Sequence, residues 1–187
     1  MIVQKVAQDQ TIDILSLDQA KTFMRIVDTE DDIDIQSFID SAIKEAEEIT
    51  NRDFANATYE LYLSSLPGEN FKFPKNPVNE IVSIEYMDLN GIYQTIDPTT
   101  YYLSNIYEIG HVLFQEYPTV NIKNDRKAVK ITFKSGYPNN SFPIDLRQWL
   151  KVRVSTLYEI REEITIGVSV SKNNHVDSIL QRYRIRS

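Results

Sequence analysis

The strongest constraint on the fold is a run of apolar residues that recurs every three or four positions over residues 35–49. This spacing places the apolar side chains on one face of an α-helix, with most of the charged residues elsewhere on its surface. Asn51 follows as a residue that favours the left-handed conformation just past a helix. The sequence therefore predicts a helix that packs along one side. The apolar positions are Ile35, Phe38, Ile39, Ala42, Ile43, Ala46 and Ile49.

A shorter helix is predicted before this one, from Ser16 to about Val27. Ser16 and Gln19 have the spacing of a capping box, in which two unpaired amide groups at the helix start are satisfied. The expected apolar stripe consists of Leu17, Ala20, Phe23, Met24 and Ile26.

An acidic stretch over residues 28–34 separates the two helices and has two interpretations. Clustered carboxylates bind hard cations such as Ca²⁺. They are also favoured at a helix N-terminus, where the macrodipole is positive. The calcium-loop spacing and its glycine are missing, which favours a helix start. The carboxylates concerned are those of Asp31, Asp32 and Asp34.

The pattern changes to that of strands between residues 58 and 133, where alternation of apolar and polar residues replaces the helical period. Asn90-Gly91 is a hairpin signal because both residues readily adopt a positive φ. Gly110 is expected in a connection between two strands. The expected strands are 58–63, 71–73, 82–87, 92–96, 101–103, 111–114 and 129–133.

Helical spacing returns after Pro143, a residue that suits the first turn of a helix. A short last helix is expected at residues 176–182. The sequence thus predicts an α+β fold, a small helical bundle from the N- and C-terminal helices with an inserted antiparallel β domain. Its expected parts are an N-terminal helical part (1–55), a β-rich insertion (56–136) and a C-terminal helical part with a tail (137–187). The stripe of the long C-terminal helix is Leu146, Trp149, Leu150, Val154 and Leu157.

The chain of 187 residues has a net charge of −7, which argues against broad binding of phosphate backbones. Residues 1–55 have a net charge of −8, residues 56–136 of −2 and residues 137–187 of +3. Ends of opposite sign attract each other within a chain or between neighbouring copies. Ordinary solvated surface is the alternative interpretation.

Candidate catalytic groups all have a plainer explanation. The chain has no cysteine and 5 glycines, so thiolate chemistry and a glycine-rich phosphate loop are not expected. His111 and His175 lack the spacing of metal ligands and are expected to be structural and solvated, respectively. The acids Glu159, Glu162 and Glu163 fit an exposed helix end better than acid–base catalysis. An oligonucleotide surface near Lys123, Arg126, Lys127 and Lys130 is disfavoured by the acidic balance of the middle segment. No catalytic, metal or cofactor site is predicted.

Four passages, in this order, resemble the head–tail connector (adaptor) proteins of tailed bacteriophages. The sequence departs from the family at Asn51, where a glycine is usual. The resemblance covers roughly residues 15–165. The passages are SLDQAKTFMRI (16–26), AEEITNR (46–52), FPKNPV with IVSIEY (73–86), and ITFKSGY (131–137) followed by Pro143-Ile144.

The resemblance implies a ring of about twelve copies below the portal protein in the virion neck, assembled in the host cytoplasm, with DNA passing through its channel. It implies contacts with portal and with head-closure or tail proteins, and no membrane. The helices would form the wall, and the C-terminal segment would dock on the portal. Alternatives are another neck component, such as a head-closure or tail-completion protein, or a small α+β binding domain. The candidate portal and ring interface residues are Arg182, Tyr183, Arg184, Arg186, Asp31, Asp32 and Asp34.

Overall fold

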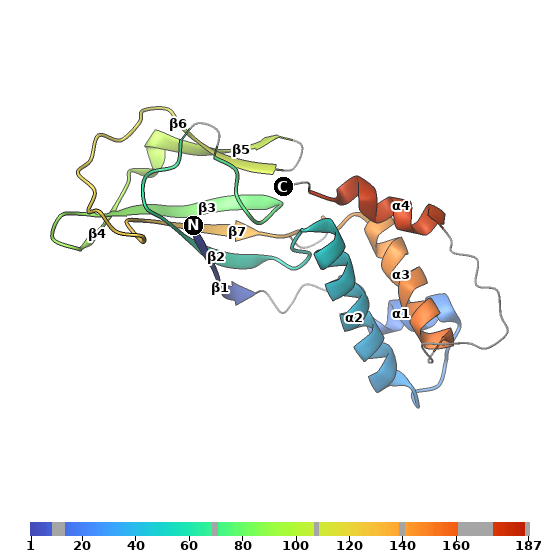
Figure 1. The fold of residues 1–187 in the computed structure, drawn as a ribbon. Helices are drawn as coiled ribbons and strands as arrows, with labels where there is room; N and C mark the ends of the chain where they lie inside the picture. Colours follow the sequence, from blue (N-terminus) through green and yellow to red (C-terminus); the bar gives the residue numbers. More distant parts are fainter. Residues whose placement is uncertain (9–13, 69–70, 107–108, 139–140, 161–173, 186–187) are drawn as a thin grey trace. The chain divides into compact units, whose positions relative to one another are not determined.

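The computed structural model describes residues 1–8, 14–68, 71–106, 109–138, 141–160 and 174–185, with the backbone alone at 174–177. The chain forms two compact units. The β unit consists of Met1–Ile12 and Ala55–Pro138, and the helical unit of Asp13–Phe54 and Asn139–Ser187. Figure 1 shows the strands and helices segregated in this way, which confirms the predicted α+β class.

The β unit is built on a five-stranded sheet in which every neighbouring pair is antiparallel. A separate hairpin consists of β5 (Tyr101–Ile106) and β6 (Ile109–Phe114). Asn90 and Gly91 turn the chain between two strands of the sheet, as predicted; Gly91 has a φ of 87°, whereas Asn90 does not adopt a positive φ. The strands of the sheet, in spatial order, are β1 (Ile2–Gln8), β2 (Ala57–Leu63), β7 (Val129–Ser135), β3 (Val78–Met87) and β4 (Tyr93–Thr95).

The core of the β unit is one hydrophobic cluster shared by the sheet and the hairpin. Side chains of β7 alternate between buried and half-buried, so the sheet presents one apolar face. Phe133 stacks on Tyr59 at 5.5 Å between ring centroids, and its ring lies 4.7 Å from that of Phe73. Tyr101 and Val112 contribute the hairpin's part of the cluster.

Three features of the β unit differ from the predictions. Strand β1 was not predicted, because an edge strand whose side chains are mostly exposed has no apolar alternation. It places residues 1–12 in the β unit, whereas the sequence grouped residues 1–55 with the helices. Residues 71–73 form only an isolated bridge between Lys72 and His111. Gly110 lies inside β6 opposite Asn105, where a Cβ would approach Val78 Cγ2 to 2.5 Å.

The helical unit contains α1 (Leu17–Met24), α2 (Asp32–Thr50), α3 (Ile144–Glu159) and α4 (Asn174–Tyr183). The capping box of α1 is present, with the Gln19 amide donating to Ser16 Oγ at 3.1 Å. Helix α1 ends at Met24, before the expected Val27, because Arg25 adopts a left-handed φ of 62°. Phe23, expected in the apolar stripe, is 40% exposed.

Helix α2 contacts the other three helices of this unit, as does α3. Its buried side chains include Ile35, Ile39, Ala42 and Ala46, which confirms the predicted apolar face. Asn51 caps it with a left-handed φ of 55°. No helix among the described residues has the length and apolar character needed to cross a membrane.

Candidate assembly site

The C-terminal end of α2 holds the last described residues of the chain through a buried arginine. Arg52, which is 6% exposed, donates from Nε to the carbonyl oxygen of Tyr183 at 2.5 Å. Its guanidinium also lies over the Tyr183 ring, 6.0 Å from the centroid. The left-handed Asn51 turns the chain so that Arg52 directly follows the helix. One side chain thus fixes both the backbone and the ring of Tyr183.

Two further contacts complete this attachment, which we call the C-terminal anchor (Thr50, Arg52, Asp145, Tyr183 and Ile185). The Tyr183 hydroxyl donates to Asp145 Oδ1 at 2.6 Å. The Ile185 amide donates to the Thr50 carbonyl at 2.9 Å. Arg182 Nη2 lies 3.7 Å from Asp145 Oδ2, but the arginine side chain is 67% exposed. The anchor therefore directs the end of α4 along the C-terminal end of α2.

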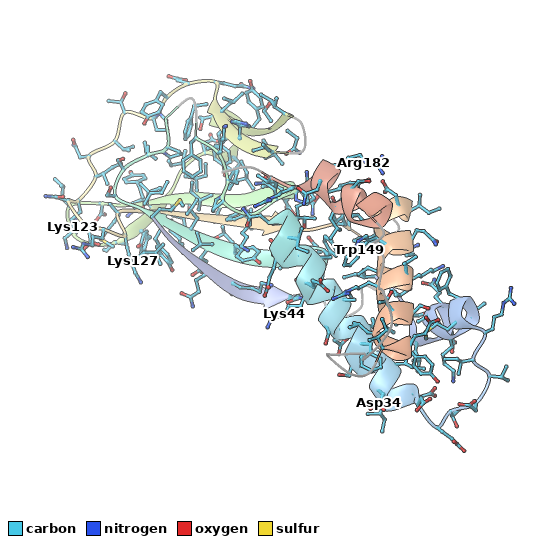
Figure 2. All side chains as sticks on the ribbon, turned by 45° about the vertical axis from the view of Figure 1, so that its right-hand side comes forward. Asp34, Lys44, Lys123, Lys127, Trp149 and Arg182 are labelled. Carbon is cyan, nitrogen blue, oxygen red and sulfur yellow. The ribbon has the colours of Figure 1, made fainter. Side chains whose placement is uncertain are left out.

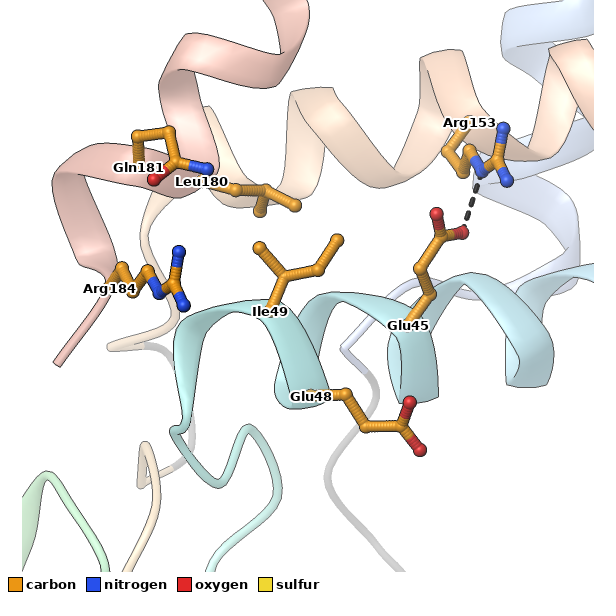
Figure 3. Close-up of a pocket in the computed structure, with 7 residues that line it drawn as sticks. All are labelled: Glu45, Glu48, Ile49, Arg153, Leu180, Gln181 and Arg184. Carbon is orange, nitrogen blue, oxygen red and sulfur yellow. Dashed lines mark hydrogen bonds and ion pairs between the residues drawn. The ribbon is translucent and has the colours of Figure 1, made fainter. Parts of the chain in front are cut away.

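A groove of about 520 Å³ lies beside the anchor. Figure 3 shows Ile49 and Leu180 facing each other across it, while Glu48 points away on the other side of α2. Glu45 Oε2 accepts from Arg153 Nε at 2.7 Å, so this acid is paired inside the groove. The groove, as named here, is lined by Glu45, Glu48, Ile49, Arg153, Leu180, Gln181 and Arg184.

The opposite end of α2 carries the acidic stretch, which we call the acidic loop (residues 27–34). It consists of the connection that precedes α2 and the first three residues of that helix. Asp31 is the N-cap residue of α2, and its Oδ2 accepts from the Tyr158 hydroxyl at 2.6 Å. Asp32 Oδ1 lies 2.5 Å from Lys21 Nζ. Asp34 is exposed in the first turn. This geometry confirms the interpretation of the stretch as a helix start.

Two large apolar side chains of the acidic loop are almost fully in solvent. Val27 is 93% exposed and Ile33 is 86% exposed. Ile33 falls outside the expected apolar stripe of α2, and the helical period was therefore a weak signal that this side chain is exposed. No sequence signal identified Arg52 or the groove, because both depend on contacts between residues far apart in the chain.

The predicted interface residues therefore form two separate groups. Arg182, Tyr183 and Arg184 lie at the C-terminal end of α2, and Asp31, Asp32 and Asp34 lie at its N-terminal end. Figure 2 shows this separation through the labelled Arg182 and Asp34. Arg186, Glu162 and Glu163 lie outside the described residues, as do the side-chain atoms of His175.

Two of the basic residues of the β unit interact with an acidic side chain or an aromatic ring. Lys130 forms an ion pair with Glu85, and Lys127 Nζ lies 4.7 Å from the centroid of the Tyr62 ring. The Tyr62 hydroxyl donates to Glu60 at 2.7 Å, and this bond, with burial and the nearby charge, raises the pKa of Tyr62 to about 12. His111 lies in β6, which confirms its predicted place in a strand. Among the described residues, no group of three or more histidines or acids is placed to hold a metal ion.

Solved structures with the same fold come from the neck of phage-like particles. The chain matches a protein in the neck of an empty gene transfer agent particle, computed with C6 symmetry, at a TM-score of 0.76 and 18% identity. It matches a protein in the virion of the native gene transfer agent equally well, and a protein in the native neck computed with C12 symmetry at a TM-score of 0.73. Each match covers 100% of this chain and 97% of the other. No curated protein matches.

The sequence profile of the head completion protein family matches residues 13–186. The chain therefore belongs to the head completion protein family. Membership confirms the resemblance to head–tail connector proteins and gives the chain a structural role in the head–tail neck of phage-like particles.

Proposed function

We propose that the chain forms a homo-oligomeric ring of about twelve copies between portal and tail, enclosing part of the DNA channel. The observation that carries this proposal is the placement of acidic and basic groups at opposite ends of α2. The gene transfer agent necks, which were computed with C6 and C12 symmetry, support a ring of this order.

The length of α2 keeps the two groups apart within one copy. Its 19 residues span about 28 Å at a rise of about 1.5 Å per residue. A salt bridge requires a few ångströms, so Asp34 and Arg184 of the same chain do not meet. A ring needs two different patches on each subunit, and these two patches are complementary in charge. When the acidic patch of one copy pairs with the basic patch of the next, both patches of every subunit have a partner.

The net charge of −7 supports a channel role, because a predominantly acidic ring offers few cations to retain DNA phosphates. The proposal includes assembly in the host cytoplasm, a purely structural role without catalysis, and contacts with portal and with head-closure or tail proteins. The C-terminal segment, which includes Arg182 and Arg186, would contact the portal.

Oligomer formation tests the proposal. Light scattering and negative-stain microscopy, with the protein alone at high concentration and mixed with its portal protein, should reveal rings. Asp34→Lys and Arg184→Glu should each weaken assembly, since an exposed pair contributes up to about 1 kcal/mol, roughly fivefold per contact. The double variant should recover assembly because the charges are exchanged.

Lys44→Glu is the matched control, since Lys44 is an exposed residue in the middle of α2, between the two groups. A chain that stays monomeric under both conditions and fails to bind portal would overturn the proposed ring.

A further inference from the structure

We infer that the groove is an interface between copies, filled by the acidic loop of the next copy, with Val27 and Ile33 as the inserted side chains. This inference rests on the proposed ring and identifies the contact that would build it. Complementary charges steer two subunits together, whereas the buried centre of a protein interface is apolar.

The loop has the composition of an interface element. Val27 and Ile33 present an apolar centre, and the surrounding carboxylates of Asp28, Glu30 and Asp34 have no ion-pair partner among the described residues. An apolar centre with a charged rim is the usual anatomy of a protein interface. Isolated exposed apolar residues are common, but two at this level of exposure in one eight-residue loop favour a partner.

The loop is also held in place before any partner arrives. Lys21 pairs with Asp32 at 2.5 Å, and Tyr158 donates to Asp31 at 2.6 Å. Arg25 fixes the preceding turn through its left-handed conformation, which two backbone hydrogen bonds support. Such preorganisation lowers the entropy lost on association.

The groove provides the complementary surface. Ile49 is half-buried beside the buried Leu180, which forms an apolar floor. Glu45 is paired with Arg153, and Glu48 lines the groove from the other side of α2 (Figure 3). Arg184 lines the groove and has no ion pair among the described residues. The two glutamates and two arginines of the lining balance each other, and the exposed Arg184 is the cation available to the carboxylates of the loop.

A second copy is the occupant that these observations favour. The loop and the groove lie at opposite ends of α2 in one compact unit, so each copy can offer its loop to one neighbour and its groove to the other. A contact of this kind is heterologous and repeats around a closed ring.

Disulfide crosslinking provides the direct test, because the chain contains no cysteine. The double variant Ile33→Cys with Gln181→Cys, oxidised under conditions of assembly, should give a ladder of covalent multimers. Gln181 is exposed at the groove, so the substitution leaves Leu180 intact. Each single variant should stay largely monomeric, because a heterologous contact does not bring the same position of two copies together, and one thiol per chain cannot form more than a dimer.

Ile33→Asp should raise the concentration needed for assembly by roughly 10- to 100-fold, since an apolar side chain that becomes buried is replaced by a charge. Ile92→Asp is the control, because Ile92 is an exposed isoleucine of the β unit. Rings of the parent chain together with no ladder and normal assembly of Ile33→Asp would overturn the inference and leave the proposed function standing. Absence of rings in the parent chain, alone and with portal, would overturn both.

Discussion

Replacing Arg52 by Met tests whether one buried guanidinium holds the C-terminal segment. Methionine keeps most of the apolar stem but removes the donor to the Tyr183 carbonyl at 2.5 Å. A hydrogen bond from a charged group contributes about 1.5–3 kcal/mol. The stacking on Tyr183, at 6.0 Å, lies at the limit of a cation–π contact and adds about 0.5 kcal/mol. We expect a loss of about 2–3.5 kcal/mol in the free energy of unfolding.

Arg153→Met is the matched control in the same unit. Arg153 also donates from Nε to an oxygen, at 2.7 Å, but its side chain and that of Glu45 are both more than a third exposed. Solvent screening reduces such a pair to less than about 1 kcal/mol. The two substitutions remove the same donor group, so a much larger loss of stability for Arg52→Met than for Arg153→Met supports the buried anchor.

The fluorescence of Trp149 gives the assay. It is the only tryptophan, it is 3% exposed, and it lies on α3, so its emission reports the unfolding of the helical unit. Urea titrations should shift the midpoint strongly for Arg52→Met and little for Arg153→Met. Hydrogen exchange should show faster exchange of the Ile185 amide in Arg52→Met. Equal effects of the two variants, or unchanged protection of Ile185, would refute the assignment of the anchor.

Two further predictions concern the β unit. Gly136→Ala should lower the free energy of unfolding by about 1–3 kcal/mol, as measured by thermal unfolding. Gly136 has a φ of 114°, and a Cβ would lie 2.7 Å from the Ala55 carbonyl carbon. Gly68→Ala, with open space around the Cβ, should change little, and equal losses for both would contradict the steric explanation. The pKa of Tyr62, raised to about 12 by its bond to Glu60, should appear in a pH titration of ring-labelled tyrosines and be absent in Tyr62→Phe. Because the folded pKa lies above the ordinary value of 10.0, the stability from this bond is fully present below pH 10 and lost between pH 10 and 12. An ordinary titration of Tyr62 near pH 10 would refute this assignment.

Local sequence patterns predicted those elements that depend on interactions between residues close together in the chain. The apolar period of residues 35–49, the Ser16–Gln19 capping box and the αL residue Asn51 all act within a turn or two of helix. The alternation along residues 129–133 likewise predicted β7, because successive side chains of a strand point to opposite faces of the sheet and only one of these faces is buried. The family resemblance rested on the same local passages.

Tertiary structure decided the features that depend on distant partners. Strand β1 exists because its backbone pairs with β2, which its exposed side chains do not reveal. Gly110 is needed inside a strand because Val78, far away in the chain, packs against it. The C-terminal anchor joins Arg52 to Tyr183 across 131 positions, and the groove exists only where α2, α3 and α4 meet. The charges of the two candidate groups were readable in the sequence. Their separation along α2, which favours pairing between copies, followed only from the fold.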